Sequence, residues 1–189
     1  MSFVTSPHKG FTVWLTGMSG AGNSTVARLL EQRLRGVGAA VEVLDGGMVR
    51  MRLSKGLGFS RQDRDENIRG VGFVCELLSR QGVIAIAAVI SPYREARDEA
   101  RARIPEFIEV YVECALEVLI ERDTKGLYRR ALAGEIEHFT GISDPYEAPF
   151  SAEVNLRSDR ETPAESMEKI WDALAERGLG SNDRSAFAH

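Results

Sequence analysis

The stretch Gly17-Met-Ser-Gly-Ala-Gly-Asn-Ser-Thr25 lies between two segments of contrasting pattern, and it decides the fold. The residues before it, Phe11–Thr16, form a short apolar run that is typical of a buried β-strand, and the residues that follow, Ser24–Arg35, carry apolar side chains at helical spacing. A glycine-rich turn between a strand and a helix lets main-chain N–H groups curl around a phosphate, and the helix N-terminus adds partial positive charge. The stretch therefore predicts a phosphate-binding loop.

The spacing of this loop matches the P-loop pattern G-x-x-x-x-G-K-[ST] at every position except one. Gly17 and Gly22 have the required spacing and Ser24 supplies the hydroxyl that binds Mg²⁺, but Asn23 stands where the pattern has lysine. Lysine donates charge-assisted hydrogen bonds to the β- and γ-phosphates, whereas asparagine donates only neutral ones. The loss of one preorganised donor typically costs about 3–4 kcal/mol in the transition state. The residues expected to bind nucleotide are Gly17, Ser19, Gly20, Ala21, Gly22, Asn23, Ser24 and Thr25.

Two other interpretations of the loop are weaker. A dinucleotide fingerprint G-x-G-x-x-G would use Gly20 and Gly22, and Asp45 at the end of the second apolar run partly fits it, but its third glycine position holds Thr25. A nicotinamide-dependent enzyme is therefore disfavoured. A simple glycine turn without a ligand does not explain why strand, loop and helix follow in this order.

Short apolar runs alternate with helical patterns along most of the chain. Nearly continuous runs rich in Val and Ile are typical of parallel strands that are covered on both faces. The runs are Phe11–Thr16, Ala40–Leu44, Val83–Ile90, Phe107–Glu113 and Val154–Leu156, and the helical patterns are Ser24–Arg35, Arg61–Arg80, Pro92–Arg103, Leu116–Arg122 and Pro163–Glu176. This alternation predicts a single α/β domain over residues 1–176 with a parallel sheet.

Two segments depart from the alternation. Residues 123–152 are polar, contain Pro145 and Pro149 and have no long period, so we expect a loop that acts as a lid over a substrate site. Residues 177–189 are polar, and we expect a frayed, disordered tail there.

The composition excludes several classes of protein. The formal net charge of -4 argues against general nucleic-acid binding, which needs a basic surface. Cys75 and Cys114 lie in apolar stretches without a second ligand at metal-binding spacing, so we expect buried free thiols in a reducing compartment. The longest apolar run, Val83–Ile90, is far shorter than the ~20 residues that span a bilayer, and Met1–Lys9 does not have the pattern of a signal peptide. We therefore expect a cytoplasmic protein without membrane or nucleic-acid partners.

Beyond the loop, a series of short strings resembles the adenylylsulfate kinases in order and spacing from about Gly10 to Glu176. The strings are Leu44-Asp45-Gly46, Arg50, Leu57-Gly58-Phe59, Asp63-Arg64, Glu66-Asn67-Ile68-Arg69, Ile90-Ser91-Pro92-Tyr93-Arg94, Lys125-Gly126-Leu127-Tyr128, Phe139-Thr140-Gly141-Ile142 and Asp144-Pro145-Tyr146-Glu147-Ala148-Pro149. The resemblance implies a P-loop NTPase fold with a five-stranded parallel sheet, helices on both faces and a lid. It also implies transfer of the γ-phosphate of ATP to the 3′-hydroxyl of adenosine 5′-phosphosulfate, dependence on Mg²⁺, and a homodimer that can associate or be fused with an ATP sulfurylase.

The same resemblance implies a role for individual side chains. Substrate binding falls to Arg50, Phe59, Arg64, Asn67, Ile90, Ser91, Lys125 and Phe139, catalysis to Asp45, Ser91 and Lys125, nucleotide contact to Arg122 as well as the loop, and the metal to Ser24. Guanidinium forks suit a tetrahedral anion, and Phe59 and Phe139 would sandwich the adenine, with Phe139 exposed in a polar segment. Without the resemblance, we would place each arginine on the solvated face of a helix and Lys125 in solvent. Ser91 would be expected to cap a helix that begins at Pro92.

The residues that differ from the family pattern lie at positions that act in phosphoryl transfer. Besides Asn23, Gly47 and Met48 stand where the family has aspartate and asparagine in an Asp-Gly-Asp-Asn run. That aspartate would orient the nucleophile and hold the metal shell, and glycine can do neither. Two hypotheses remain open: a weak kinase in which Asp45, Lys125 or Lys55 compensates, and a kinase-like domain that binds nucleotide or adenosine phosphosulfate in a regulatory or structural role.

Overall fold

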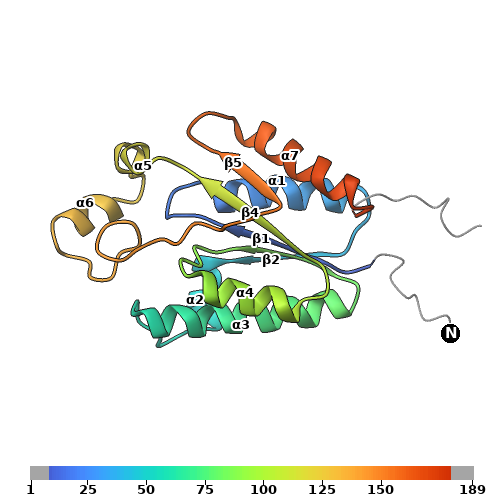
Figure 1. The fold of residues 1–189 in the computed structure, drawn as a ribbon, viewed down its shortest axis with the longest axis horizontal. Helices are drawn as coiled ribbons and strands as arrows, with labels where there is room; N and C mark the ends of the chain where they lie inside the picture. The colour runs from blue at the N-terminus through green and yellow to red at the C-terminus, as the bar shows by residue number, and fades with distance from the viewer. Residues whose placement is uncertain (1–8, 180–189) are drawn as a thin grey trace, which may run out of the picture.

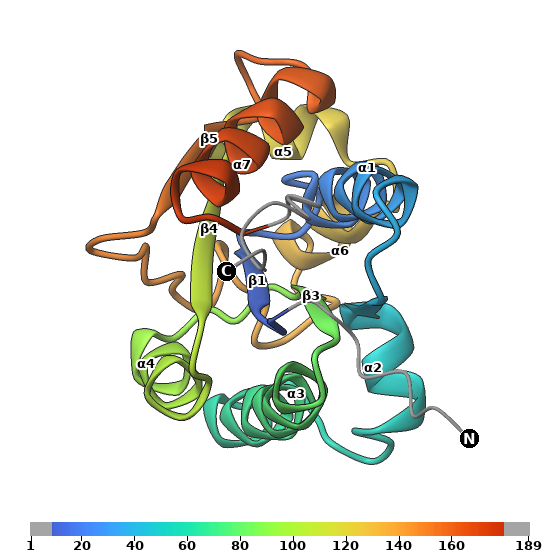
Figure 2. The same cartoon turned by 90° about the vertical axis from the view of Figure 1, so that its right-hand side faces the viewer.

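The computed structural model describes residues 9–179 as a parallel sheet between two helical layers (Figures 1 and 2). All five predicted strands are present, and all are parallel, in the order β2-β3-β1-β4-β5. Their bounds are β1 Thr12–Thr16, β2 Val41–Asp45, β3 Ile84–Ala88, β4 Phe107–Glu113 and β5 Val154–Arg157. The α/β prediction is confirmed.

The two faces of the sheet carry different helices because successive side chains of a strand point to opposite faces. Val13 and Leu15 of β1 pack under α1 (Asn23–Gly36) and α7 (Pro163–Glu176), whereas Trp14 packs on the side of α3 (Arg61–Arg80) and α4 (Arg94–Arg103). Figure 2 shows the two layers on either side of the sheet, with the short helix α2 (Gly46–Arg52) beside α3. Cys75 and Cys114 are buried free thiols, as expected, and burial raises the pKa of the Cys75 thiol to about 12.

Helix ends follow the local sequence. Thr162 caps α7 in a capping box, in which its hydroxyl accepts from the Glu165 N–H and Glu165 accepts from the Thr162 N–H. Three of the predicted helices, α3, α5 (Leu116–Arg122) and α7, have the predicted bounds.

Three details correct the sequence predictions. The fourth helix begins at Arg94, not at Pro92, because Ser91 has a positive φ of 41° and Tyr93 is extended; Ser91 is therefore not the N-cap. Helix α2 was not predicted, and the lid segment contains a short helix, α6 (Leu127–Leu132). Neither shows the apolar run that marks α5, which is no longer than α2.

The prediction of a frayed tail is wrong for residues 177–179. Leu179 is buried and its N–H donates to Leu174 O, so the first residues after α7 belong to the packed domain. The rest of the predicted tail lies outside the described residues. Across residues 9–179, no helix is both long and apolar enough to cross a bilayer.

Candidate active site

The glycine-rich loop lies at the carboxyl end of β1, between the ends of β3 and β4. Gly20 (φ 78°) and Gly22 (φ 111°) adopt left-handed conformations that side chains disfavour. At Gly17, an added Cβ would lie 2.5 Å from Val112 O, so only glycine fits there. Among the described residues, no main-chain carbonyl accepts from the N–H groups of Gly20 and Gly22, which leaves them free for an anion.

Asn23, at the lysine position of the pattern, is turned back onto its own loop. Its Nδ2 donates to Gly17 O over 3.2 Å, and the side chain is only 9% exposed. Its Oδ1 is buried and accepts no hydrogen bond from the described residues. The amide therefore stabilises the loop but brings no charge to a bound phosphate.

Ser24 and Asp45 form an oxygen pair beside the loop. The Ser24 hydroxyl donates to Asp45 Oδ2 over 2.5 Å, and Asp45 Oδ1 accepts from the Gly47 N–H over 3.0 Å, which caps α2. Mg²⁺ takes one or two protein oxygens and otherwise waters and phosphate oxygens, so these two residues fit a magnesium site shared with a nucleotide. Within residues 9–179, no cluster of three or more His, Cys, Asp or Glu side chains competes as a metal site.

A chain of hydroxyls connects the ends of β1 and β3. The Trp14 indole donates to Ser91 Oγ over 3.1 Å, Ser91 donates to Thr16 Oγ1 over 2.8 Å, and Thr16 donates to Ile90 O over 2.7 Å. The register of β1 beside β3 brings these residues together. Ser91 is buried, so its side chain is fixed rather than free to rotate.

Arg50 and Arg64 form a cationic pair beside the aromatic ring of Phe59. Their guanidinium carbons lie 4.2 Å and 5.4 Å from the ring centroid. Arg64 donates to Phe59 O over 2.9 Å and to His138 O over 2.6 Å, and Arg50 donates to Gly58 O over 3.0 Å. These acceptors are all main-chain carbonyls.

Neither arginine of this pair forms an ion pair with any residue between 9 and 179. Burial lowers the pKa of Arg64, and the neighbouring Arg50 lowers it further; burial also lowers the pKa of Arg50, against the attraction of Asp63. A guanidinium stays charged in proteins. Two adjacent positive charges that lack a carboxylate partner are suited to an anionic ligand.

The two predicted adenine-binding aromatics differ in exposure. Phe59 is 50% exposed and available for stacking, whereas Phe139 is only 9% exposed and packs edge-on against Tyr128 at 5.0 Å. The expected exposure of Phe139 is therefore wrong: Tyr128, on α6, covers it. Arg64 still connects the two aromatic segments, because it contacts the carbonyls of Phe59 and of His138.

Other predicted side chains take varied positions. Asn67 is buried and accepts from the Ser54 hydroxyl over 2.5 Å, and Arg122 donates to Ser158 O over 2.9 Å. Lys125 and Lys55 are exposed and form no hydrogen bond or ion pair with residues 9–179, so neither occupies the position of the missing lysine here.

Several contacts of the site were not predicted. Tyr128, in the segment 123–152, donates from its hydroxyl to Ser19 O over 2.7 Å and joins this segment to the glycine loop. Tyr146 bonds Thr16 Oγ1 over 2.9 Å. Both tyrosines lie in strings that resembled the family, which is the signal that could have identified them. Trp14 lies in an apolar run, so the sequence predicts only that it is buried in the core.

Comparisons with known proteins agree with this geometry. The family model for adenylylsulphate kinase matches residues 9–157. An adenylyl-sulfate kinase of Microcystis aeruginosa is 57% identical over 170 residues, which cover 90% of this chain and 94% of that protein. A probable bifunctional SAT/APS kinase of Sorangium cellulosum is 57% identical over 179 residues, 95% of this chain but 31% of that protein. Among solved structures, the Mycobacterium tuberculosis APS kinase in complex with AMPPNP and APS has a TM-score of 0.85 at 41% identity and covers 89% of this chain and 99% of that one.

Proposed function

The chain belongs to the adenylylsulphate kinase family, and from this premise we propose that it transfers the γ-phosphate of ATP to the 3′-hydroxyl of adenosine 5′-phosphosulfate. It is a phosphotransferase with the P-loop kinase fold. The product of this reaction is 3′-phosphoadenosine 5′-phosphosulfate.

One observation carries the substrate assignment. Two anion-binding elements lie at the same edge of the sheet: the glycine loop and the unpaired Arg50–Arg64 pair. Helix α2 connects them, since Asp45 contacts Ser24 of the loop and α2 leads from Asp45 to Arg50. A substrate that carries a phosphosulfate group and an aromatic base fits the arginines beside the exposed ring of Phe59.

Each group of the site has a task in this reaction. The free N–H groups of the loop bind the phosphates of ATP, and Ser24 and Asp45 would hold Mg²⁺, which neutralises the charge that develops on the transferred phosphoryl group. Arg50, Arg64 and Asn67 hold the phosphosulfate end, so that the 3′-hydroxyl faces the γ-phosphate. Ser91 lies at the end of β3 between the two substrates.

The residues Asn23 and Gly47 favour slow turnover. Because turnover is expected to be slow, a binding or regulatory role is the second candidate function. The Asn23 amide is used by its own loop, and Gly47 has no carboxylate for the nucleophile. We propose that binding of both substrates is retained while transfer is slow, because phosphoryl transfer depends on charge and position.

A coupled assay with ATP, Mg²⁺ and adenosine 5′-phosphosulfate tests this proposal by comparing the natural chain with the double variant Asn23→Lys, Gly47→Asp. We expect the variant to turn over about 100- to 1,000-fold faster, the range for one restored transition-state donor. Gly47 has no left-handed φ, and a Cβ there meets only Asp45 Oδ1 at 3.3 Å, so aspartate can be accommodated.

The control for this assay is Lys9→Ala, which changes an exposed cation before β1, at the end of that strand opposite the loop. If the natural chain already matches the double variant, the site has other donors and the slow-turnover proposal is wrong. If neither chain forms the 3′-phosphorylated product, the kinase assignment itself fails.

We further propose that the enzyme is a cytoplasmic homodimer that works with an ATP sulfurylase. The two free thiols are compatible with a reducing compartment, and the SAT/APS kinase relative supports the pairing of the two activities. Light scattering during size exclusion would distinguish a dimer from a 20.8 kDa monomer.

A further inference from the structure

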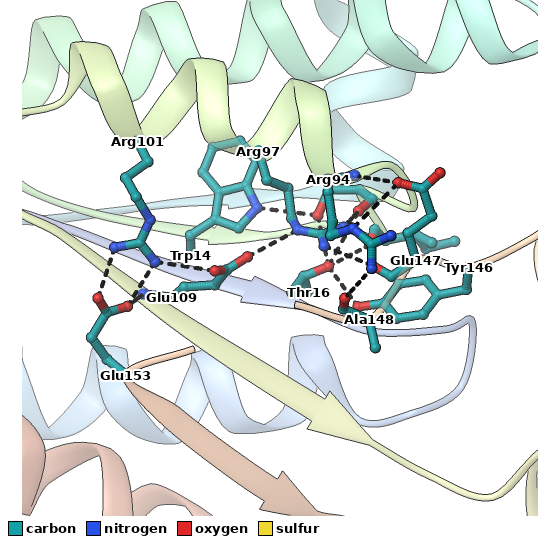
Figure 3. A network of polar contacts seen from close by, with 12 residues as sticks. Trp14, Thr16, Arg94, Arg97, Arg101, Glu109, Tyr146, Glu147, Ala148 and Glu153 are labelled. Atoms are coloured by element: carbon teal, nitrogen blue, oxygen red, sulfur yellow. Dashed lines mark hydrogen bonds and ion pairs between the residues drawn. The ribbon is translucent and has the colours of Figure 1, made fainter. Parts of the chain in front are cut away.

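A buried arginine outside the site described above connects it to the lid. Arg97 of α4 is 2% exposed and donates from all three of its guanidinium nitrogens. Its Nε pairs with Glu109 of β4 at 2.9 Å, its Nη1 donates to Ser91 O over 2.5 Å, and its Nη2 donates to Glu147 O over 2.6 Å. Figure 3 shows this side chain between Glu109 and the segment that carries Tyr146 and Glu147.

The contact with Ser91 matters because the Ser91 main chain is strained. Its φ of 41° lies in the left-handed region, which a residue other than glycine adopts only when its surroundings hold it there. Arg97 holds its carbonyl, and Trp14 and Thr16 hold its hydroxyl. Ser91 is thus fixed through both its main chain and its side chain.

The contact with Glu147 fixes the end of the lid segment that returns to the sheet. The Glu147 N–H donates to Pro92 O over 2.8 Å, its carboxylate accepts from the Arg94 N–H over 2.9 Å, and Arg94 donates to Ala148 O over 3.1 Å. The neighbouring Tyr146 reaches Thr16. Arg97 bonds the main chain of both this segment and Ser91, and Thr16 connects the same two parts through the hydroxyls of Tyr146 and Ser91.

We propose that Arg97 is a positioning residue of the phosphosulfate site: it holds Ser91 and the returning end of the lid in the arrangement that binds substrate. The proposal rests on the proposed function. Only a guanidinium can do this, because its planar fork donates in three directions from one buried position. Lysine would keep the charge beside Glu109 but could not reach Ser91 O and Glu147 O together.

The chain offers a matched control in Arg101, one turn further along α4. Arg101 shares Glu109 with Arg97 and also pairs with Glu153, but it touches neither Ser91 nor Glu147 (Figure 3). If the network has only a structural role, Arg97→Lys and Arg101→Lys should have similar effects on substrate binding. A positioning role predicts that only Arg97→Lys changes substrate binding.

Calorimetric titration of the full chain with adenosine 5′-phosphosulfate, and separately with AMPPNP and Mg²⁺, tests the proposal. We expect Arg97→Lys to weaken phosphosulfate binding about 10- to 100-fold, by analogy with residues that orient the side chains of a metal site. Nucleotide affinity should change by less than about twofold, because the bonds of Arg97 go to Glu109, Ser91 and Glu147 and not to the glycine loop. Arg101→Lys should change neither affinity, because Arg101 bonds Glu109 and Glu153 but not Ser91 or Glu147. Equal phosphosulfate affinity in the two lysine variants would overturn the proposal.

A second readout does not depend on the substrate. The Trp14 indole donates to Ser91 Oγ, so its fluorescence reports on Ser91; Trp171→Phe removes the other tryptophan. We expect Arg97→Lys to shift the Trp14 emission. Arg101→Lys should shift it less, because Arg101 reaches Trp14 only through the Phe107 ring that stacks on it. If the natural chain binds no phosphosulfate, the substrate assignment fails, and the emission of Trp14 decides the role of Arg97 by itself.

Should Arg97→Lys not fold, the double variant Arg97→Gln, Glu109→Gln takes its place. It leaves no unpaired buried charge, whose presence is strongly destabilising, and it removes the bonds to Ser91 and Glu147. The same loss of phosphosulfate affinity is expected. Retention of natural affinity in this folded variant would overturn the proposal.

Discussion

At the scale of single residues, Arg64 shows how a charged side chain can be buried and still be kept for a ligand. Its bonds to Phe59 O and His138 O fix the plane of the guanidinium without neutralising it. An ion pair in the same place would reduce its attraction for an anion. The main-chain acceptors therefore orient the charge, and Arg50 beside it doubles the charge.

Replacement of Arg64 by lysine tests this reading, because lysine keeps the charge but loses the fork. Hydrogen bonds to charged groups are worth about 1.5–3 kcal/mol each, so we expect phosphosulfate affinity to fall at least tenfold with nucleotide affinity unchanged. Calorimetry measures both. Arg61→Lys is the control on the same helix, since Arg61 is exposed and pairs only weakly with Asp65 and Glu95. Equal effects of the two substitutions would contradict the role of Arg64.

Single residues were predictable where a motif names them and unpredictable where packing decides. The spacing of the loop predicted the glycine turn that the structure has, whereas the substrate roles of Arg50, Arg64 and Phe59 rest on the resemblance and stay predictions. The burial of Phe139 depends on Tyr128 of a helix that has no period in the sequence. The positive φ of Ser91 depends on Arg97, which a sequence pattern reads as one of several charges on a solvated helix.

At the scale of elements, helices with a cap signal or an apolar pattern could be predicted, whereas α2 and α6 could not. For α7, Thr162 and Glu165 form the capping box and Pro163 occupies the first helical position. Helix α2 begins where Asp45 accepts from the Gly47 N–H, and α6 begins where Asp123 accepts from the N–H groups of Tyr128 and Arg129. From the sequence we assign Asp45 to catalysis and Asp123 to the lid segment, and that assignment does not predict that each carboxylate also accepts hydrogen bonds at the start of a helix.

Replacement of Thr162 by alanine removes the side-chain oxygen that accepts from the Glu165 N–H. Loss of an N-cap typically costs about 0.5–2 kcal/mol, so we expect thermal unfolding at lower temperature. Substrate affinities should be unchanged, because the side-chain bonds of Thr162 are made to Glu165 alone among the described residues. Thr162→Ser keeps the oxygen and should retain natural stability. If serine destabilises as much as alanine, the cap is not the cause.

At the scale of the whole molecule, alternation of strands and helices predicted the class of fold, but the strand order needed the structure. Nothing in the five apolar runs says that β1 lies between β3 and β4. That order matters for function, since it places Trp14 and Thr16 beside Ser91. It also places Glu109 of β4 where α4 and the segment before β5 both reach it.

The Arg101–Glu109–Glu153 cluster connects α4, β4 and the segment before β5, and it should make stability depend on pH. Burial alone would raise the pKa of Glu153, but hydrogen bonds from Arg101 and from the Glu109 N–H, with the charge of Arg101, outweigh it and hold the pKa below its ordinary value. A carboxyl with a lowered pKa in the folded state stabilises the fold above its ordinary pKa. That stabilisation is lost as the pH falls through the lowered pKa.

We therefore expect the free energy of unfolding of the natural chain to decline as the pH falls below about 4.5, where an unfolded Glu begins to bind protons. Glu153→Gln should be less stable at pH 7 by at most about 1.5–3 kcal/mol, the range for hydrogen bonds to charged groups. It should also lose less stability on acidification, because the amide does not titrate. Urea unfolding at several pH values between 3 and 7 measures both effects. Glu135→Gln, which changes an exposed pair with Arg130, should keep the natural slope. A Glu153→Gln chain whose stability declines as steeply as that of the natural chain would show that Glu153 is not a source of the acid sensitivity.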